Sequence, residues 1–406
     1  VMAERKKKVK QSSSSNSLYF SFPPIYQLIG AIIISIITAV FLTHFIAKSP
    51  INAVRFTLPD PPSIQSNNHL SSSHLLLEDS VYGPESIAED PKTGRLYAGL
   101  KTGLICEINM DKHTNKAHIV RAVRLTNATD CDGSYSSFPK CGRPLGIRFS
   151  PTGTLLVVDA YLGLFEVDLK NEKVYTLVRA GSSIDNVVET PPLRYLNDVD
   201  VLPDGRIVMS ESSYRFDDRD MIYDMFEHRP NGRLLIFDRS TESLKEVASD
   251  LYFPNGIVVY RGKVIIAEMG TARILSFSPS SGSVRVLIDN LPGYPDNLRR
   301  SFDGRTIWIA IPVMRSKGDN WFNERPHIRE LLAKLFSRQA LELITSYFSP
   351  SYGCVLRMDV ERAEIVDSLQ DATGSTVSSI SCATETIDGH LVMGSDDNYY
   401  IARVPV

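Results

Sequence analysis

The chain contains 406 residues, of which 43% are hydrophobic and 22% are charged, and this length accommodates one large domain with appendages. The formal net charge is −3 at pH 7, and six of the basic residues lie within the first 50 positions. No basic patch interleaved with aromatic residues occurs beyond them, which excludes a typical nucleic-acid-binding protein.

The N-terminus predicts a membrane anchor. Residues 1–24 are basic and rich in serine, as in a disordered cytosolic tail. Residues 25–47 contain no Asp, Glu, Lys or Arg, and at about 1.5 Å per residue they can cross a hydrocarbon core about 30 Å thick. A cleaved signal peptide is the alternative, but its apolar core is usually shorter and closer to the N-terminus. We therefore expect an uncleaved signal-anchor helix.

The charge distribution predicts the orientation of this anchor. The basic run from Arg5 to Lys10 precedes the apolar segment, and positively charged flanks remain cytosolic. We expect a single-pass type II protein of the plasma membrane or endoplasmic reticulum, with everything after Lys48 luminal or extracellular. Residues 48–80 are rich in Pro, Ser, Asn and His and are expected to form a stalk.

Residues 81–406 contain six copies of one pattern, in which a glycine turn is followed at once by an apolar strand. Such turns favour glycine because it tolerates positive φ. Repeats of 42 to 85 residues, each with several short strands, are typical of a β-propeller. The sequence thus predicts an all-β fold, a six-bladed β-propeller. The glycines are Gly94, Gly153, Gly205, Gly262, Gly304 and Gly389.

One position in each repeat should point at the propeller axis, because the innermost strands begin near the central channel. It lies seven to nine residues before each glycine. Four of the six repeats place a carboxylate or amide oxygen there, and Ca²⁺ prefers such ligands. The alternative is that Asn and Asp are common near strand starts. The six positions are Glu85, Pro144-Leu145, Asn197, Asn255, Asp296 and Ile380.

Two local features agree with a luminal or extracellular body. Asn127 begins an acceptor sequence for N-glycosylation, Asn-Ala-Thr. Cys131 and Cys141 flank a polar loop that a disulfide could close in an oxidising compartment. No spacing of Cys and His indicates a zinc site. The other cysteines are Cys106, Cys354 and Cys382, and because the total of five is odd, at least one cysteine is unpaired or forms an intermolecular bond.

The longest repeat holds a helical insertion, residues 319–348, before the last blade. Pro326 suits a first helical turn, and apolar residues then recur at helical spacing up to Phe336. A second helix is predicted from Gln339 to Tyr347. The insertion either packs across one end of the propeller or forms an amphipathic lid or membrane contact.

Six segments of the sequence are familiar as motifs. They are Cys141–Ile147, Val158–Leu164, Phe253–Ile257, Pro295–Arg300, Asn323–Ile328 and Lys334–Ser337. These motifs resemble the strictosidine-synthase-like family, above all its animal branch of adipocyte plasma membrane-associated proteins. That family is similar to the wider six-bladed group of paraoxonases and gluconolactonases.

The resemblance implies a calcium ion in the channel and esterase activity toward aryl esters. The implied ligands are Glu85, Asn197, Asn255, Asp296 and Asn297. Two departures restrict the chemistry. Residues 311–315 lack the glutamate that plant strictosidine synthase uses, so we do not expect strictosidine synthase activity. Leu145 occupies the region where paraoxonases place a histidine, which argues against a histidine-based lactonase mechanism.

The preferred hypothesis is a membrane-anchored, calcium-dependent hydrolase of small esters, with Ca²⁺ as its cofactor. Asp296 is the better candidate for the general base and Glu85 the second. Three carboxylates that end second strands, Asp159, Glu211 and Glu268, could serve instead or could cap blades. A serine hydrolase is not expected, because Gly-x-Ser-x-Gly is absent from the sequence. The alternative is a non-catalytic extracellular binding module with structural calcium.

Overall fold

The computed structural model describes residues 24–111, 114, 116–187 and 189–406, and the chain divides into two compact units, residues 1–48 and 49–406. In the first unit, helix α1 spans Pro24–Ile46. Its window Ile25–Leu42 has a mean hydropathy of 2.4 and is not buried, so the helix is long and apolar enough to cross a membrane. The predicted apolar helix is confirmed, whereas nearly all of the predicted tail lies outside the described residues.

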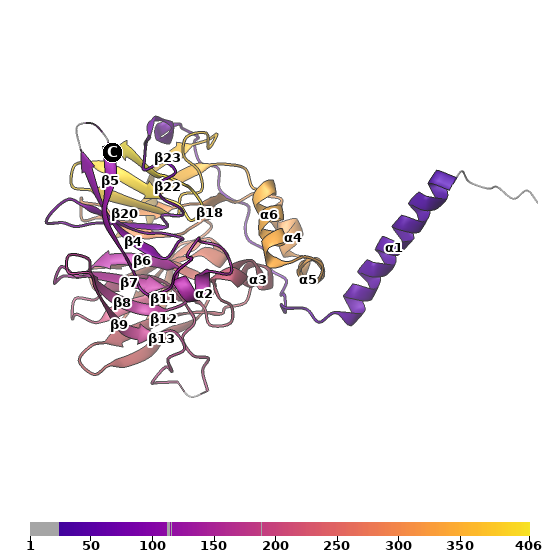
Figure 1. The fold of residues 1–406 in the computed structure, drawn as a ribbon, viewed down its shortest axis with the longest axis horizontal. Helices are drawn as coiled ribbons and strands as arrows, with labels where there is room; N and C mark the ends of the chain where they lie inside the picture. The colour runs from indigo at the N-terminus through magenta and orange to yellow at the C-terminus, as the bar shows by residue number, and fades with distance from the viewer. Residues whose placement is uncertain (1–23, 112–113, 115, 188) are drawn as a thin grey trace, which may run out of the picture. The chain divides into compact units, whose positions relative to one another are not determined.

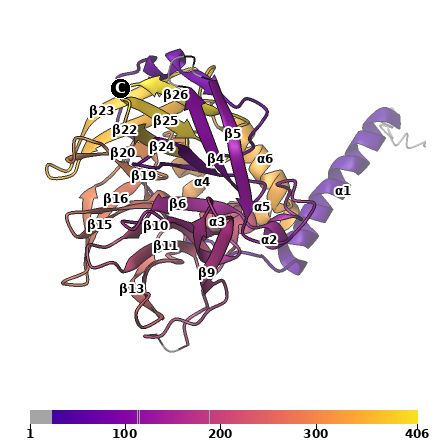
Figure 2. The same cartoon turned by 60° about the vertical axis from the view of Figure 1, so that its left-hand side comes forward.

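The second unit consists of six four-stranded antiparallel sheets, the blades of a propeller (Figures 1 and 2). Blade one contains β2 (Ser86–Glu89), β3 (Leu96–Gly99), β4 (Leu104–Asp111) and β5 (Lys116–Arg124). Blade two contains β6 (Pro144–Phe149), β7 (Leu155–Asp159), β8 (Gly163–Asp168) and β9 (Lys173–Arg179). Blade three contains β10 (Tyr195–Val201), β11 (Ile207–Ser213), β12 (Gly232–Asp238) and β13 (Ser243–Leu251).

The remaining blades follow in chain order. Blade four contains β14 (Pro254–Tyr260), β15 (Lys263–Glu268), β16 (Arg273–Ser278) and β17 (Ser283–Ile288). Blade five contains β19 (Leu298–Arg300), β20 (Thr306–Ala310), β22 (Gly353–Asp359) and β23 (Glu364–Asp371). Blade six contains β24 (Cys382–Thr386), β25 (His390–Gly394), β26 (Ile401–Pro405) and β1 (His74–Leu76).

The blades form a closed ring. The first strand of each blade contacts the first strand of the next, from β2 through β6, β10, β14 and β19 to β24, and β24 contacts β2 again. The predicted six-bladed propeller is therefore confirmed. All six turn glycines have positive φ, between 67° and 88°, as the repeated pattern predicts.

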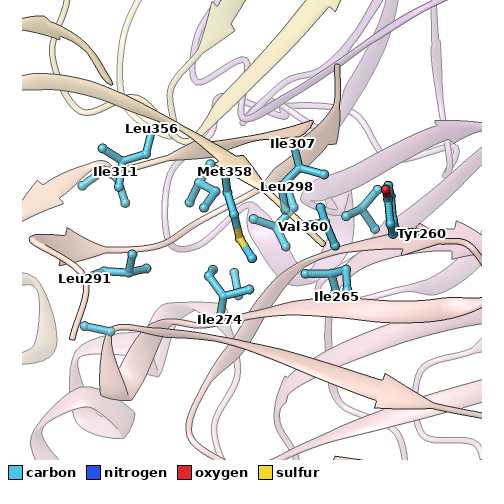
Figure 3. Close-up of a cluster of buried hydrophobic side chains, with 14 of the residues drawn as sticks. Tyr260, Ile265, Ile274, Leu291, Leu298, Ile307, Ile311, Leu356, Met358 and Val360 are labelled. Atoms are coloured by element: carbon cyan, nitrogen blue, oxygen red, sulfur yellow. The ribbon is translucent and has the colours of Figure 1, made fainter. Parts of the chain in front are cut away.

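Apolar side chains fill the space between blades. Because a middle strand is covered on both faces by neighbouring blades, β7 is buried along its whole length. Figure 3 shows the cluster between blades four and five, where Ile265 and Ile274 face Ile307 and Met358. Burial of this kind, at about 25 cal/mol per Å² of apolar surface, holds the blades together.

The last blade is completed by the first strand of the chain. β1 pairs antiparallel with β26, with Leu76 opposite Ile401. The prediction of a stalk over residues 48–80 is therefore wrong for most of its length. Ile51 and Leu70 are buried, and Arg315 Nη2 donates a hydrogen bond to the Pro59 carbonyl oxygen at 2.5 Å. The Ile51 and Leu70 side chains and the Pro59 carbonyl group make these contacts, which a polar and proline-rich composition does not reveal.

The predicted helical insertion is present, and it lies inside blade five, between β20 and β22. It contains α4 (Asp319–Asn323), α5 (Pro326–Leu335) and α6 (Arg338–Phe348). A short sheet of β18 (Gly293–Tyr294) and β21 (Val313–Met314) precedes these helices. The other helices are η1 (His69–Ser72), α2 (Phe138–Cys141), η2 (Asp218–Asp220), α3 (Met221–Glu227) and η3 (Met269–Thr271).

Antiparallel pairing places the insertions at one end of the propeller. In blade three, Tyr195 at the start of β10 lies opposite Ser213 at the end of β11, so η2 and α3 follow at the end where the first strand begins. In blade five, Leu298 at the start of β19 lies opposite Ile309, so the α4–α6 insertion follows at the same end. We call this end the channel mouth. Figure 1 shows α3 beside the insertion helices.

The closure of the ring generates a prediction. Leu76→Ala removes a buried side chain from β1 and should lower the free energy of unfolding by about 2–5 kcal/mol. His74→Ala in the same strand is the control, because His74 is exposed and should change stability by less than about 0.5 kcal/mol. Denaturant unfolding of the detergent-solubilised chain measures both variants. Equal stability of the two would show that β1 does not hold the ring.

Candidate metal centre at the channel mouth

The residues predicted to face the axis meet in the structure. Glu85 directly precedes β2, Asn197 lies in β10, Asn255 lies in β14, and Asp296 and Asn297 precede β19. Asn297 Nδ2 donates a hydrogen bond to Glu85 Oε1 at 2.7 Å, although the two residues are 212 positions apart in the chain. The neighbouring Asn255 amide lowers the pKa of Asp296, so these two side chains also lie close together. These contacts bring together side chains from blades one, four and five, and Asn197 lies on the first strand of the adjoining blade three.

Bulges and glycines aim these side chains. The pairing register shifts between Leu196 and Val199 in β10, and between Pro254 and Ile257 in β14, so each irregularity falls at a predicted ligand. Such bulges turn side chains away from the sheet. Gly256 lets the fifth blade approach closely, because a Cβ there would lie 2.5 Å from the Asn297 Cα.

Five oxygen atoms at this point are buried without a hydrogen-bond partner. One oxygen is contributed by each predicted ligand, and all five residues are at most 7% exposed. A buried polar atom without a partner usually costs about 1–3 kcal/mol, so five together need an explanation. Hard-oxygen coordination of Ca²⁺ would satisfy them all. The atoms are Glu85 Oε2, Asn197 Oδ1, Asn255 Oδ1, Asp296 Oδ1 and Asn297 Oδ1.

The electrostatics of the cluster also fit a cation. Burial raises the pKa of Asp296 well above its usual value, and the neighbouring Glu85 charge raises it further. Burial likewise raises the pKa of Glu85, while the Arg143 guanidinium lowers it in part. A bound cation would stabilise both ionised carboxylates. Among the described residues, no group of three or more His, Cys, Asp or Glu side chains that could hold a metal is found.

Apolar and aromatic side chains adjoin the oxygens. Leu145 and Ile380 occupy the two axial positions without oxygen, and both are buried. Leu145 packs in a cluster with Tyr195, Phe253 and Met269, and the Asn255 amide contacts the Met269 sulfur at 3.7 Å. We call this cluster the apolar wall; its other members are Ala160, Tyr161, Met221, Met225 and Tyr294. Sequence patterns did not reveal it, because its members come from strand ends and loops.

A second layer of charged residues supports the ligands and was also missed. Arg299 donates from Nη1 to Asp198 Oδ2 at 3.0 Å and from Nη2 to Ser86 Oγ at 2.6 Å. Asp198 Oδ2 also accepts from the Ile257 backbone N–H at 3.0 Å. All four residues are buried and lie within two positions of a predicted ligand. This adjacency is the sequence signal that could have identified them.

Two of the three other carboxylates considered from the sequence have structural partners. Glu211 pairs with Arg233 and accepts from the Arg194 backbone N–H at 2.6 Å. Glu268 makes the same two kinds of contact, with Arg273 and with the Tyr252 backbone N–H at 3.1 Å. The repetition shows that these carboxylates cap blades. The third, Asp159, accepts at Oδ1 from the backbone N–H groups of Tyr161 and Leu162, whereas its Oδ2 is buried without a hydrogen-bond partner.

The cysteine prediction is confirmed. Cys131 and Cys141 form a disulfide, with their Cα atoms 5.6 Å apart. Cys106, Cys354 and Cys382 are free and buried.

Comparisons with known proteins agree on a family. The family model described as "Strictosidine synthase" matches residues 197–275. The family model described as "Strictosidine synthase-like, N-terminal" matches residues 64–108. An adipocyte plasma membrane-associated protein of Salmo salar is 34% identical, over 91% of this chain and 87% of the relative. The Homo sapiens protein of that name is 31% identical, over 88% and 84%.

Two solved structures share the fold at low identity. A Xanthomonas campestris gluconolactonase superposes with a TM-score of 0.52 at 14% identity, covering 89% of this chain and 99% of that protein. Regucalcin from Agrobacterium tumefaciens, described as a calcium-binding protein, superposes with a TM-score of 0.50 at 12% identity, covering 82% and 93%. At these identities the likeness concerns the fold alone.

The five unpartnered oxygens predict stabilisation by calcium. Added Ca²⁺ should raise the melting temperature of the full-length protein in detergent, and a chelator should reverse the rise. Glu85→Gln and Asn255→Ala should both weaken this response, because one removes a charge and the other a neutral ligand. Glu172→Gln, at an exposed carboxylate, is the control and should respond as the unmodified chain does. A melting temperature indifferent to calcium would contradict the metal centre.

Asn127 yields a prediction about topology. It is exposed in the loop before the disulfide, so a glycosylating enzyme can reach it. Expression in cells should give an N-glycosylated protein whose propeller resists protease added to sealed vesicles, because we expect the body to be luminal. Asn127→Gln should remove the glycan and leave the protease resistance. An unglycosylated, protease-sensitive propeller would reverse the orientation.

Proposed function

The chain belongs to the strictosidine synthase-like family, with the adipocyte plasma membrane-associated proteins, and on this premise we propose a membrane-anchored, calcium-dependent hydrolase of small esters such as aryl esters. The observation that carries the proposal is the set of five buried, unpartnered oxygens at the channel mouth. An oxygen set of this kind suits a hard cation next to a reacting carbonyl.

The residues Glu85, Asn197, Asn255, Asp296 and Asn297 would hold the cation. Calcium, when bound, supplies Lewis-acid polarisation of an ester carbonyl and stabilises the negative charge that develops on its oxygen. The ester bond would be broken by water, with a carboxylate of the site accepting the proton of that water.

Asp296 is the stronger candidate for this base. One Glu85 oxygen is already engaged by the Asn297 amide, and the Arg143 charge lowers the Glu85 pKa. Asp296 has no cationic partner among the main influences on its pKa, which burial and the Glu85 charge raise. A carboxylate with a raised pKa is a better proton acceptor.

The apolar wall would bind the hydrocarbon part of the substrate. Phe253, Met269 and Tyr195 pack together in this buried cluster, and the Met269 sulfur contacts the Asn255 amide of the oxygen set at 3.7 Å. Tyr195 and Tyr161 donate hydrogen bonds to the carboxylate of Asp218, at 2.9 and 3.2 Å, which fixes both phenol rings. A preformed apolar surface next to a few polar groups is typical of small-molecule sites and favours aryl or alkyl esters.

The two departures from relatives agree with hydrolysis by water. Ile311, in the segment that lacks the strictosidine synthase glutamate, is fully buried in a hydrophobic cluster. Leu145, where a paraoxonase-type histidine would lie, belongs to the apolar wall. The shared fold of a gluconolactonase and of calcium-binding regucalcin is compatible with the proposal, which draws its support from the site itself.

Asp296→Asn separates metal binding from catalysis. The amide can ligate but cannot accept a proton, so the variant should retain substantial calcium and lose about 10²–10⁴-fold in aryl-ester turnover. Phenyl acetate hydrolysis measures turnover, and isothermal titration of Ca²⁺ measures binding.

Asp204→Asn, at an exposed turn, is the matched control and should change neither quantity. Full turnover by Asp296→Asn at full calcium occupancy would show that Asp296 is not the base. A calcium-stabilised protein without any esterase activity would instead favour the non-catalytic binding module.

A further inference from the structure

Helix α6 carries apolar residues on the face that points away from the propeller. Leu343, Tyr347 and Phe348 are 71%, 82% and 77% exposed, and Ile344 beside them is also exposed. A surface helix of a soluble domain usually turns charged or polar residues to water. We call these four residues the outer face of α6. The exposed polar residues beside the outer face on α6 are Gln339 and Ser346, and neither carries a charge.

The opposite face of α6 is firmly attached to the body. Leu341 is buried, and Arg338 forms an ion pair with Asp220 in η2. Glu342 accepts a hydrogen bond from the Tyr135 hydroxyl, in the disulfide-closed loop. The orientation of the helix is therefore fixed by specific contacts on its inner side. These contacts prevent the helix from rotating, so its apolar outer face stays exposed to solvent.

The segment that follows the candidate membrane helix is anchored beneath these helices. α1 ends at Ile46, and Ile51 is buried in one cluster with Ala333 of α5 and Leu341 of α6. The backbone N–H of Ala53 donates to Glu330 Oε1 at 3.1 Å. Only four residues separate Ile46 from Ile51, and even a fully extended chain spans no more than about 18 Å over this step.

We propose that the outer face of α6 docks on the surface of the bilayer that α1 crosses. If α1 spans the membrane, the short connection keeps Ile51, and with it α5 and α6, close to the headgroups. Leucine, isoleucine and phenylalanine would enter the boundary between headgroups and acyl chains, and Tyr347 suits the interface itself. Figure 2 shows α5 and α6 adjacent in the propeller body.

The charges indicate which lipids suffice. The insertion, residues 319–348, contains four Lys or Arg and four Asp or Glu, so its formal net charge is zero. Docking would then depend on burying apolar surface and not on anionic headgroups. A zwitterionic phosphatidylcholine bilayer is therefore the expected partner, with little dependence on salt. This inference requires neither calcium nor esterase activity.

A fluorescent label at position 346 tests the docking. Ser346 is exposed on the outer face, and the three free cysteines are buried, so Ser346→Cys provides a selective site for an environment-sensitive dye. The full-length labelled chain is reconstituted in phosphatidylcholine vesicles with or without brominated acyl chains. We expect blue-shifted emission that the brominated lipid quenches and that high salt leaves unchanged. The label on Ser281→Cys, in the exposed β16–β17 turn, should show neither effect.

A charged variant completes the test. Leu343→Glu with Tyr347→Glu, in the Ser346→Cys chain, should abolish the quenching and leave the melting temperature unchanged, because both side chains are largely exposed. Unquenched emission from Ser346→Cys would overturn the proposal. Emission that shifts with protein concentration, independently of brominated lipid, would also overturn it, because a second copy of the chain would then cover the face.

Discussion

The structure depends on one energetically unfavourable arrangement near the start of the inner strands. Two carboxyl groups and three amides are buried there, and each has one oxygen without a hydrogen-bond partner. These oxygen atoms are buried, and the Glu85 charge lies close to Asp296. Folding must therefore hold the ligands against a tendency to spread apart. Closely spaced backbones at Gly256, register shifts in β10 and β14, and the Arg299–Asp198 contact all restrain them. A polar site that is preorganised in this way binds a cation with little rearrangement.

Partner groups distinguish the structural carboxylates of this propeller from the functional candidates. Glu211 and Glu268 occupy matching positions in adjacent blades, and each is satisfied by an arginine and a backbone N–H group. Judged by burial alone, Glu211 and Glu268 would be candidates for a functional site as much as Glu85 is. What differs is the unpaired oxygen of Glu85. A buried acid without an adequate partner indicates a missing ligand more reliably than burial does.

The sequence predicted what local chemistry determines. Positive φ at Gly205, the first-turn position of Pro326 and the spacing of Cys131 and Cys141 each follow from residues close in the chain. The axial positions were predictable because the repeat fixes their register. Contacts between distant segments leave no such trace. The pairing of β1 with β26, the apolar wall and the packing of Ile51 under α6 depend on how the completed ring folds back on itself.

The closing pair of strands also sets the order in which the molecule can be made. β1 leaves the ribosome more than 300 residues before β26, its hydrogen-bonding partner. Until β26 is synthesised, the pairing of β26 with β1 in blade six cannot form, and blade one has no neighbouring blade on one side. Every shorter intermediate is an open arc with unpaired strand edges, which are prone to wrong pairing. Ring closure is thus a late step across a long loop, because β1 has no hydrogen-bonding partner until β26 has been synthesised.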